Sequence, residues 1–205
     1  MAFKLHIGNS TNDLDHLITD INLAFKNASK ESERLFGHHN ADVFVINELY
    51  YVIPEYGFGG FTTSDRTIYI NINKSKKTLD INLLTSLIMH EMSHAYRWSA
   101  VGYGETLGEA LVTEGIGCYI ESLYLGHCPI YSSIKLKDKY INLAIKELNS
   151  SNYVDGWFFG DDKFDRWVGY TLGFKIVEKY FNHNNHKKSD IVNIDAKKIL
   201  DYYFK

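Results

Sequence analysis

The sequence predicts an α+β fold, in which a small mixed or antiparallel sheet comes first and a mainly helical part follows. Three segments near the start of the chain, residues 3–7, 42–53 and 67–73, have the β-branched, aromatic or alternating character of strands. From about residue 79 onward, apolar residues recur instead at helical spacing. Strands that precede helices favour an α+β fold over a repeating βαβ sheet.

The first elements are expected as strand, helix and strand. Residues 3–7 (FKLHI) have the character of a short strand. Residues 11–36 place leucine, isoleucine and phenylalanine at helical spacing, and Gly37 is a suitable end for that helix. Residues 42–53 are rich in valine, isoleucine and tyrosine, and Pro54 would end this strand.

A turn, a strand and a series of helices complete the chain. Residues 55–66 (EYGFGGFTTSDR) hold three glycines and are expected to form a turn. Residues 67–73 (TIYININ) alternate as a half-buried strand does. The apolar periodicity then predicts helices over about 79–99, 106–125, 130–149, 161–181 and 195–204. We expect one domain over residues 1–205, with the sheet and the first long helix in about 1–100 and the helical part in about 101–205.

Composition limits the classes of function. The chain has 205 residues, of which 45% are apolar and 23% charged, and its net charge of −3 gives no basic excess for binding nucleic acid. No apolar run is long enough to span a bilayer, and the N-terminus lacks the apolar stretch of a signal peptide. Cys118 and Cys128 form neither a metal-type pair nor a disulfide framework. A cytoplasmic protein without nucleic-acid or membrane partners is therefore expected, and its oligomeric state is open.

The stretch "HEMSH", residues 90–94, carries the main chemical signal. His90 and His94 are four residues apart on a predicted helix, so both imidazoles can reach one metal ion. Glu91 points about 100° away from His90, where it can serve as general base toward a water molecule beside the metal. The alternative is an amphipathic helix whose polar face happens to carry these three residues, and HExxH needs further context.

A catalytic zinc site also needs a third protein ligand, and the next predicted helix offers Glu114. Glu114 follows His94 by twenty positions and shares a face with small and apolar residues, where a carboxylate must be paired or bound to metal. Gly115 and Gly117 beside it need a structural reason, and close packing on the HExxH helix would supply one. The alternative for Glu114 is a salt bridge, for example to Arg97.

Other residues of the same helix compete for a role at the metal. Glu109 is the main competitor for third ligand, although its face resembles core, and Glu105 is better explained as a helix first-turn charge. Glu121 could orient a ligand histidine from the outer shell, or be a solvated surface glutamate. Cys118 lies one turn after Glu114 and is better explained as a small core residue than as a ligand.

The spacing of "HEMSH" and Glu114 resembles that of the gluzincin metallopeptidases. More specifically, these motifs, together with "ALVTEGIG" and "GYTLG" at 169–173, resemble a family of predicted zinc-dependent proteases, domain of unknown function 2268. The resemblance covers about residues 40–181. It implies that His90, His94 and Glu114 bind Zn²⁺ and that Glu91 is base and proton shuttle. Tyr170 is our candidate for the donor that stabilises the transition state; the alternative is a core tyrosine.

The sequence therefore predicts a zinc-dependent peptidase that acts on peptide or protein substrates. If the strand over 67–73 lies at the sheet edge, an extended peptide could pair with it, with the "GFGGF" turn as the rim of the cleft. Two alternatives stay open: a zinc hydrolase of other amides or esters, and an inactive zinc-binding or structural domain. A structural zinc site is closed by four protein ligands, whereas only three candidates are evident here.

Overall fold

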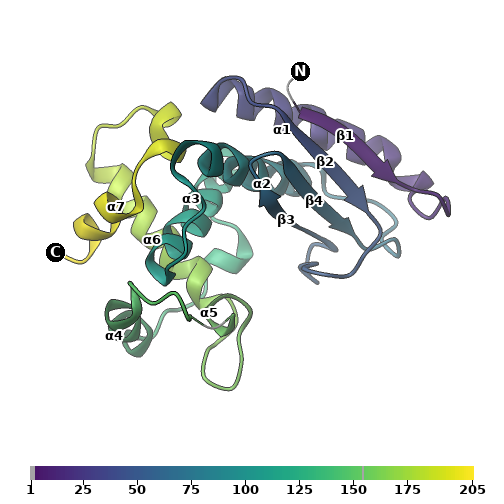
Figure 1. The fold of residues 1–205 in the computed structure, drawn as a ribbon. Helices are drawn as coiled ribbons and strands as arrows, with labels where there is room; N and C mark the ends of the chain where they lie inside the picture. Colours follow the sequence, from purple (N-terminus) through teal and green to yellow (C-terminus); the bar gives the residue numbers. More distant parts are fainter. Residues whose placement is uncertain (1–2, 154) are drawn as a thin grey trace. The chain divides into compact units, whose positions relative to one another are not determined.

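A computed structural model describes residues 3–153 and 155–205 and confirms the α+β class, with a mixed four-stranded sheet and a mostly helical part (Figure 1). The chain divides into two compact units, of which the first ends at Ser99 and the second begins at Ala100. The first unit holds the sheet and most of the long helix that carries "HEMSH". The assignment of the whole chain to one domain stays a prediction.

The first unit is built on a sheet of order β1-β2-β4-β3. Its elements are β1 (Phe3–Gly8), a 3-10 turn, α1 (Ile18–Phe36), β2 (Ala41–Ile46), β3 (Phe58–Ser64), β4 (Thr67–Ile72) and α2 (Ile81–Val101). Strands β1, β2 and β4 are parallel, and β3 pairs with β4 in the antiparallel sense. The helix predicted over 11–36 begins only at Ile18, because residues 9–17 form turns and the 3-10 segment.

Side chains alternate along the strands, so one face of the sheet is aliphatic and buried and the other carries half-buried rings. Valines and isoleucines on one side of β2 and β4 are fully buried. The opposite face carries cross-strand pairs of rings: His6 lies 4.8 Å from Phe44, Phe44 lies 5.5 Å from Tyr69, and Tyr69 lies 5.0 Å from Phe61, measured between ring centroids. The register pairs these same residues on neighbouring strands. Half-buried aromatic rings of this kind stabilise a sheet through cross-strand contacts.

The segment "FGGFTTS" was predicted as part of a turn, and this prediction was wrong, because it forms β3 at the edge of the sheet. The strand over 67–73 was considered as an edge strand, but β4 lies between β2 and β3. The glycines of β3 do not form a turn; they allow neighbouring segments to approach the strand closely. A Cβ on Gly59 would lie 1.9 Å from the main-chain oxygen of Tyr51, in a segment that was predicted as strand and lies beyond the end of β2.

The second unit is mainly helical. Its elements are α3 (Leu107–Leu125), a 3-10 turn (Ile130–Ser132), α4 (Asp138–Glu147), α5 (Gly156–Phe159), α6 (Val168–His183), a 3-10 segment (Lys188–Asn193) and α7 (Ala196–Tyr203). The helix predicted over 130–149 is thus a 3-10 turn followed by α4, and the one predicted over 161–181 begins at Val168. Among the helices of the described residues, none has the combined length and apolar character that crossing a bilayer requires.

Helices α3 and α6 approach each other through glycines. A Cβ on Gly115 would lie 2.2 Å from the main-chain oxygen of Gly173, and a Cβ on Gly173 would lie 2.2 Å from that of Leu111. Gly115, the glycine of "TEG", is therefore explained by the close approach of two helices, which a larger residue would prevent. Packing of Gly115 against the HExxH helix was expected, but its nearest neighbours lie on α6. The sequence alone does not show which helix packs at a given glycine.

Replacing Gly173 with alanine is expected to destabilise the protein by about 3 kcal/mol or more, because the new methyl group overlaps a main-chain oxygen that cannot rotate away. For a chain of this length, the midpoint of thermal unfolding should fall by roughly 6–12 °C. Gly126→Ala is the comparison, since Gly126 has a φ of 79° but no atom close to its missing Cβ. That change should cost only about 1–2 kcal/mol of backbone strain. Equal losses in the two variants would contradict the close packing of α3 on α6.

Candidate metal centre

The residues of "HEMSH" lie in the middle of α2, a helix with little amphipathic character. Asp80 caps its start, since Oδ1 of Asp80 accepts hydrogen bonds from the main-chain nitrogens of Asn82 (2.9 Å) and Leu83 (3.0 Å). Every residue from Leu84 to Arg97 is buried. The two histidines and the glutamate are therefore not the wet side of an amphipathic surface helix, which was the alternative for this motif.

His90, Glu91 and His94 come together on α2. Their side chains are only 3%, 4% and 3% exposed, and each offers a nitrogen or oxygen atom within 4.8 Å of the others. The two imidazole rings are 4.6 Å apart between centroids and nearly perpendicular, at 86°. Imidazole nitrogens and carboxylate oxygens are suitable zinc ligands. The donor set on this helix fits a metal ion.

Glu91 contacts the edge strand β3. The Thr62 hydroxyl lies 2.8 Å from Oε2 of Glu91 and 3.0 Å from its main-chain oxygen, so it can donate a hydrogen bond to either. Gly60, two residues earlier on the same face of β3, has no side chain to fill the space beside this glutamate. A Cβ there would lie 2.7 Å from Cγ and 3.0 Å from Oε1 of Glu91. The position of the Glu91 carboxylate is thus defined by the strand as well as by its own helix.

Glu109 has a structural role at the start of α3. Its Oε2 accepts hydrogen bonds from the main-chain nitrogens of Glu105 (2.9 Å) and Thr106 (3.0 Å) and from the Thr106 hydroxyl (2.8 Å). The Thr106 side chain in turn accepts from the main chain of Glu109, which completes a capping box. The carboxylate that competed with Glu114 for the metal is accounted for by this cap.

Glu114 lies further along α3, half-buried, in the second unit. Its Oε1 accepts a hydrogen bond of 2.7 Å from the Tyr103 hydroxyl. Tyr103 is held in turn, because the Thr113 hydroxyl donates to its main-chain oxygen at 2.9 Å. A neutral donor orients a carboxylate without cancelling its charge. The place of Glu114 in a ligand set with the two histidines stays a prediction.

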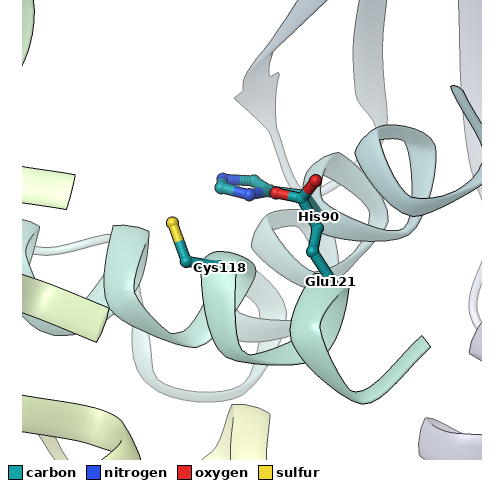
Figure 2. Close-up of side chains that lie close together, drawn as sticks. All are labelled: His90, Cys118 and Glu121. Atoms are coloured by element: carbon teal, nitrogen blue, oxygen red, sulfur yellow. The ribbon is translucent and has the colours of Figure 1, made fainter. Parts of the chain in front are cut away.

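Cys118 and Glu121 project from α3 (Figure 2). Glu121 is fully buried and accepts a hydrogen bond from the Tyr131 hydroxyl, so the surface alternative for this glutamate is wrong. Burial, reinforced by the negative charges of Glu121 and Glu114, holds the pKa of the Cys118 thiol well above its ordinary value. Burial and then Glu121 raise the pKa of Tyr131 in the same way. Cys118 is a buried small residue, as predicted, and is not activated as a nucleophile.

Tyr170 lies on α6 within a cluster of aromatic side chains in the second unit. Its ring is 5.1 Å from that of Tyr131 and 5.2 Å from that of Phe158, in both cases edge to face. It is half-buried. This packing fits the alternative of a core tyrosine. The role of the Tyr170 hydroxyl as a donor to the transition state stays a prediction.

Three residues that hydrogen-bond to these carboxylates were not predicted from the sequence: Thr62 at Glu91, Tyr103 at Glu114 and Tyr131 at Glu121. Thr62 precedes Glu91 by 29 positions, and no local pattern joins them. The sequence around Thr62 gave no clear signal, because Gly59 and Gly60 interrupt the alternation that a strand shows. Tyr103 lies shortly before the Thr106 cap of α3, and no sequence pattern distinguished it among the 15 tyrosines of the chain.

A family model described as "Predicted Zn-dependent protease (DUF2268)" matches residues 19–201, nearly the whole chain. The chain belongs to this family. The match includes α2 and α3, and hence His90, Glu91, His94 and Glu114. No curated protein and no solved structure matches the chain. Family membership agrees with the resemblance drawn from "HEMSH", "TEG" and "GYTLG", and it suggests a dependence on zinc.

Proposed function

We propose that this protein is a zinc-dependent peptidase of the gluzincin type with a zincin-like fold. The observation that carries the proposal is the buried group of His90, Glu91 and His94 on α2, whose ligand atoms lie within 4.8 Å of one another. A helix in a protein interior rarely places three ionisable side chains together without a partner that stabilises them. Membership of a family of predicted zinc-dependent proteases supports the same conclusion.

His90, His94 and Glu114 are the proposed zinc ligands. Three protein ligands leave one coordination position for water or substrate, as catalytic zinc sites require. The capping box of Glu109 supports the choice of Glu114, because it removes the main competitor on α3. The hydrogen bond from Tyr103 supports it further, since outer-shell donors orient ligating carboxylates.

Glu91 is the proposed general base and proton shuttle. A bound zinc ion would make a water molecule more acidic and would polarise the peptide carbonyl. Glu91 would accept a proton from the water that attacks the carbonyl carbon, and as the C–N bond breaks it would return that proton to the leaving amine nitrogen. Tyr170 is the proposed hydrogen-bond donor to the oxyanion. A buried carboxylate whose Oε2 is already held by Thr62 suits this role, because little reorganisation is needed before the proton moves.

A peptide is the proposed substrate because of β3. This strand is at the edge of the sheet, and its residues Gly60 and Thr62 contact Glu91 directly. An extended peptide can add to a sheet edge through main-chain hydrogen bonds. The bridge between Ile53 and Phe58 covers the first part of that edge, which leaves Gly60–Ser64 as the segment nearest the base.

Hydrolysis of a peptide library by the purified protein tests the proposal. We expect cleavage that a zinc chelator abolishes and that added Zn²⁺ restores, because the ligand set gives no other source of an activated water. Cleavage of esters or small amides with no cleavage of peptides would favour a different zinc hydrolase. Zinc binding without hydrolysis of either kind would contradict the enzyme assignment and favour a binding domain.

A further inference from the structure

The register of the sheet places Thr62 and Gly60 on the side of β3 that faces α2. Thr62 pairs with Ile68 of β4, and Gly60 pairs with Ile70, and both isoleucines are fully buried. Phe61, between them, pairs with Tyr69 on the opposite face, and the register shifts after Thr62. Thr62 and Gly60 therefore lie on the inner side of the edge strand, and both approach Glu91 there.

We infer that Thr62 is a positioning residue for the general base, and that Gly60 is the complementary position that leaves room for it. This inference rests on the proposed function, because it assigns Glu91 the role of base. Thr62 contacts Glu91 twice, at Oε2 (2.8 Å) and at the main-chain oxygen (3.0 Å). The hydroxyl of Thr62 therefore links β3 to the side chain or to the main chain of Glu91 on α2.

The two carboxylate oxygens of Glu91 have different surroundings. Oε2 accepts from Thr62, whereas Oε1 lies beside the absent side chain of Gly60, 3.0 Å from where its Cβ would be. A hydrogen bond to a charged acceptor is stronger than one between neutral groups, and it fixes one oxygen. The other oxygen then points where no side chain of β3 intrudes. A carboxylate held at one oxygen by a strand residue has a fixed orientation, which suits it to exchange a proton in one direction.

The strand makes Thr62 a rigid donor. A β-branched side chain has few rotamers, and its backbone is fixed by the pairing with Ile68. Misplacing a catalytic group by about 1 Å can cost about 100-fold in rate. The hydroxyl of Thr62 should therefore matter for turnover more than for substrate binding or zinc binding.

The first test compares Thr62→Val, Thr62→Ser and Thr19→Val in peptide hydrolysis. Valine keeps the shape of threonine but removes the donor, so kcat should fall roughly 10- to 100-fold, the value of one hydrogen bond to a charged group, with KM and zinc content unchanged. Serine restores the hydroxyl and should recover most of kcat. Thr19 is exposed on α1, outside the edge strand and the proposed ligand set, so Thr19→Val should match the wild type. A Thr62→Val enzyme with wild-type kcat would overturn the inference.

The second test is independent of activity. A double-mutant cycle of Thr62→Val with Glu91→Leu measures the coupling between the two side chains in thermal unfolding. We expect Thr62→Val to lower the unfolding midpoint by roughly 3–8 °C when Glu91 is present, and by clearly less when leucine replaces it, because only the main-chain oxygen of residue 91 then remains as an acceptor. Equal shifts in the two backgrounds would overturn the inference even if the enzyme is a peptidase. Coupling in a wild-type protein that hydrolyses nothing would instead refute the proposed function, and the catalytic role of Thr62 would fall with it.

Discussion

Replacing Glu91 with glutamine is expected to lower kcat for peptide hydrolysis by roughly 100- to 10,000-fold, the usual contribution of a positioned general acid–base. Glutamine has the shape of glutamate and can still accept the hydrogen bond from Thr62, so the fold around α2 should be kept. It cannot accept a proton from water at neutral pH. Because Glu91 is proposed as base and not as ligand, the zinc content should stay near that of the wild type.

The control for this change is Glu105→Gln, which removes one carboxylate from an exposed position. That variant should keep wild-type kcat. Steady-state kinetics and elemental analysis of the same preparations separate the possible outcomes. Undiminished hydrolysis by Glu91→Gln would refute the role of Glu91, and loss of zinc together with activity would make Glu91 a ligand rather than a base.

Two glutamates of α3 offer a matched pair for the third ligand. Glu114→Gln is expected to weaken zinc binding by more than the 10- to 100-fold that loss of an outer-shell partner costs, since a neutral amide replaces a charged ligand. Glu109→Gln should leave zinc binding unchanged, because glutamine also serves at this position of a capping box. Competition with a chromophoric chelator measures both affinities.

The reverse result would contradict the proposed ligand set. If Glu109→Gln released zinc and Glu114→Gln did not, the ligand assignment drawn from the twenty-residue spacing would be wrong, and the capping box would have to open when zinc binds. Circular dichroism of both variants serves as the check on folding, because Glu109 caps α3 and Glu114 accepts from Tyr103. Neither change removes a buried apolar group.

The helices that carry the chemistry could be predicted closely from the sequence, and the edge strand could not. Periodic apolar residues predicted a helix over about 106–125, and α3 runs from Leu107 to Leu125. The segment of β3 contains Gly59 and Gly60, which normally indicate a turn. Their reason is tertiary, because Tyr51 and Glu91 approach where side chains would otherwise be. Contacts of this kind depend on how the chain returns on itself.

The same distinction applies to the candidate site. The meeting of His90 and His94 follows from helical geometry alone, so a spacing of four residues was sufficient to predict it. The hydrogen bonds of Thr62 to Glu91 and of Tyr131 to Glu121 join separate elements, and their partners are ordinary residue types in this chain. Burial of Glu121 was missed for a similar reason, since its neighbours on α3 include polar residues.

The measurement that tests the central claim most directly is the zinc content of the wild-type protein. Untagged protein purified without chelator should contain close to one zinc ion per chain by elemental mass spectrometry, since His90, His94 and Glu114 make one three-ligand site. Protein that holds no zinc, even after incubation with Zn²⁺ and removal of the excess, would contradict the account. The three buried side chains of α2 would then be a structural cluster, and the assignment of a zinc peptidase would have to be withdrawn.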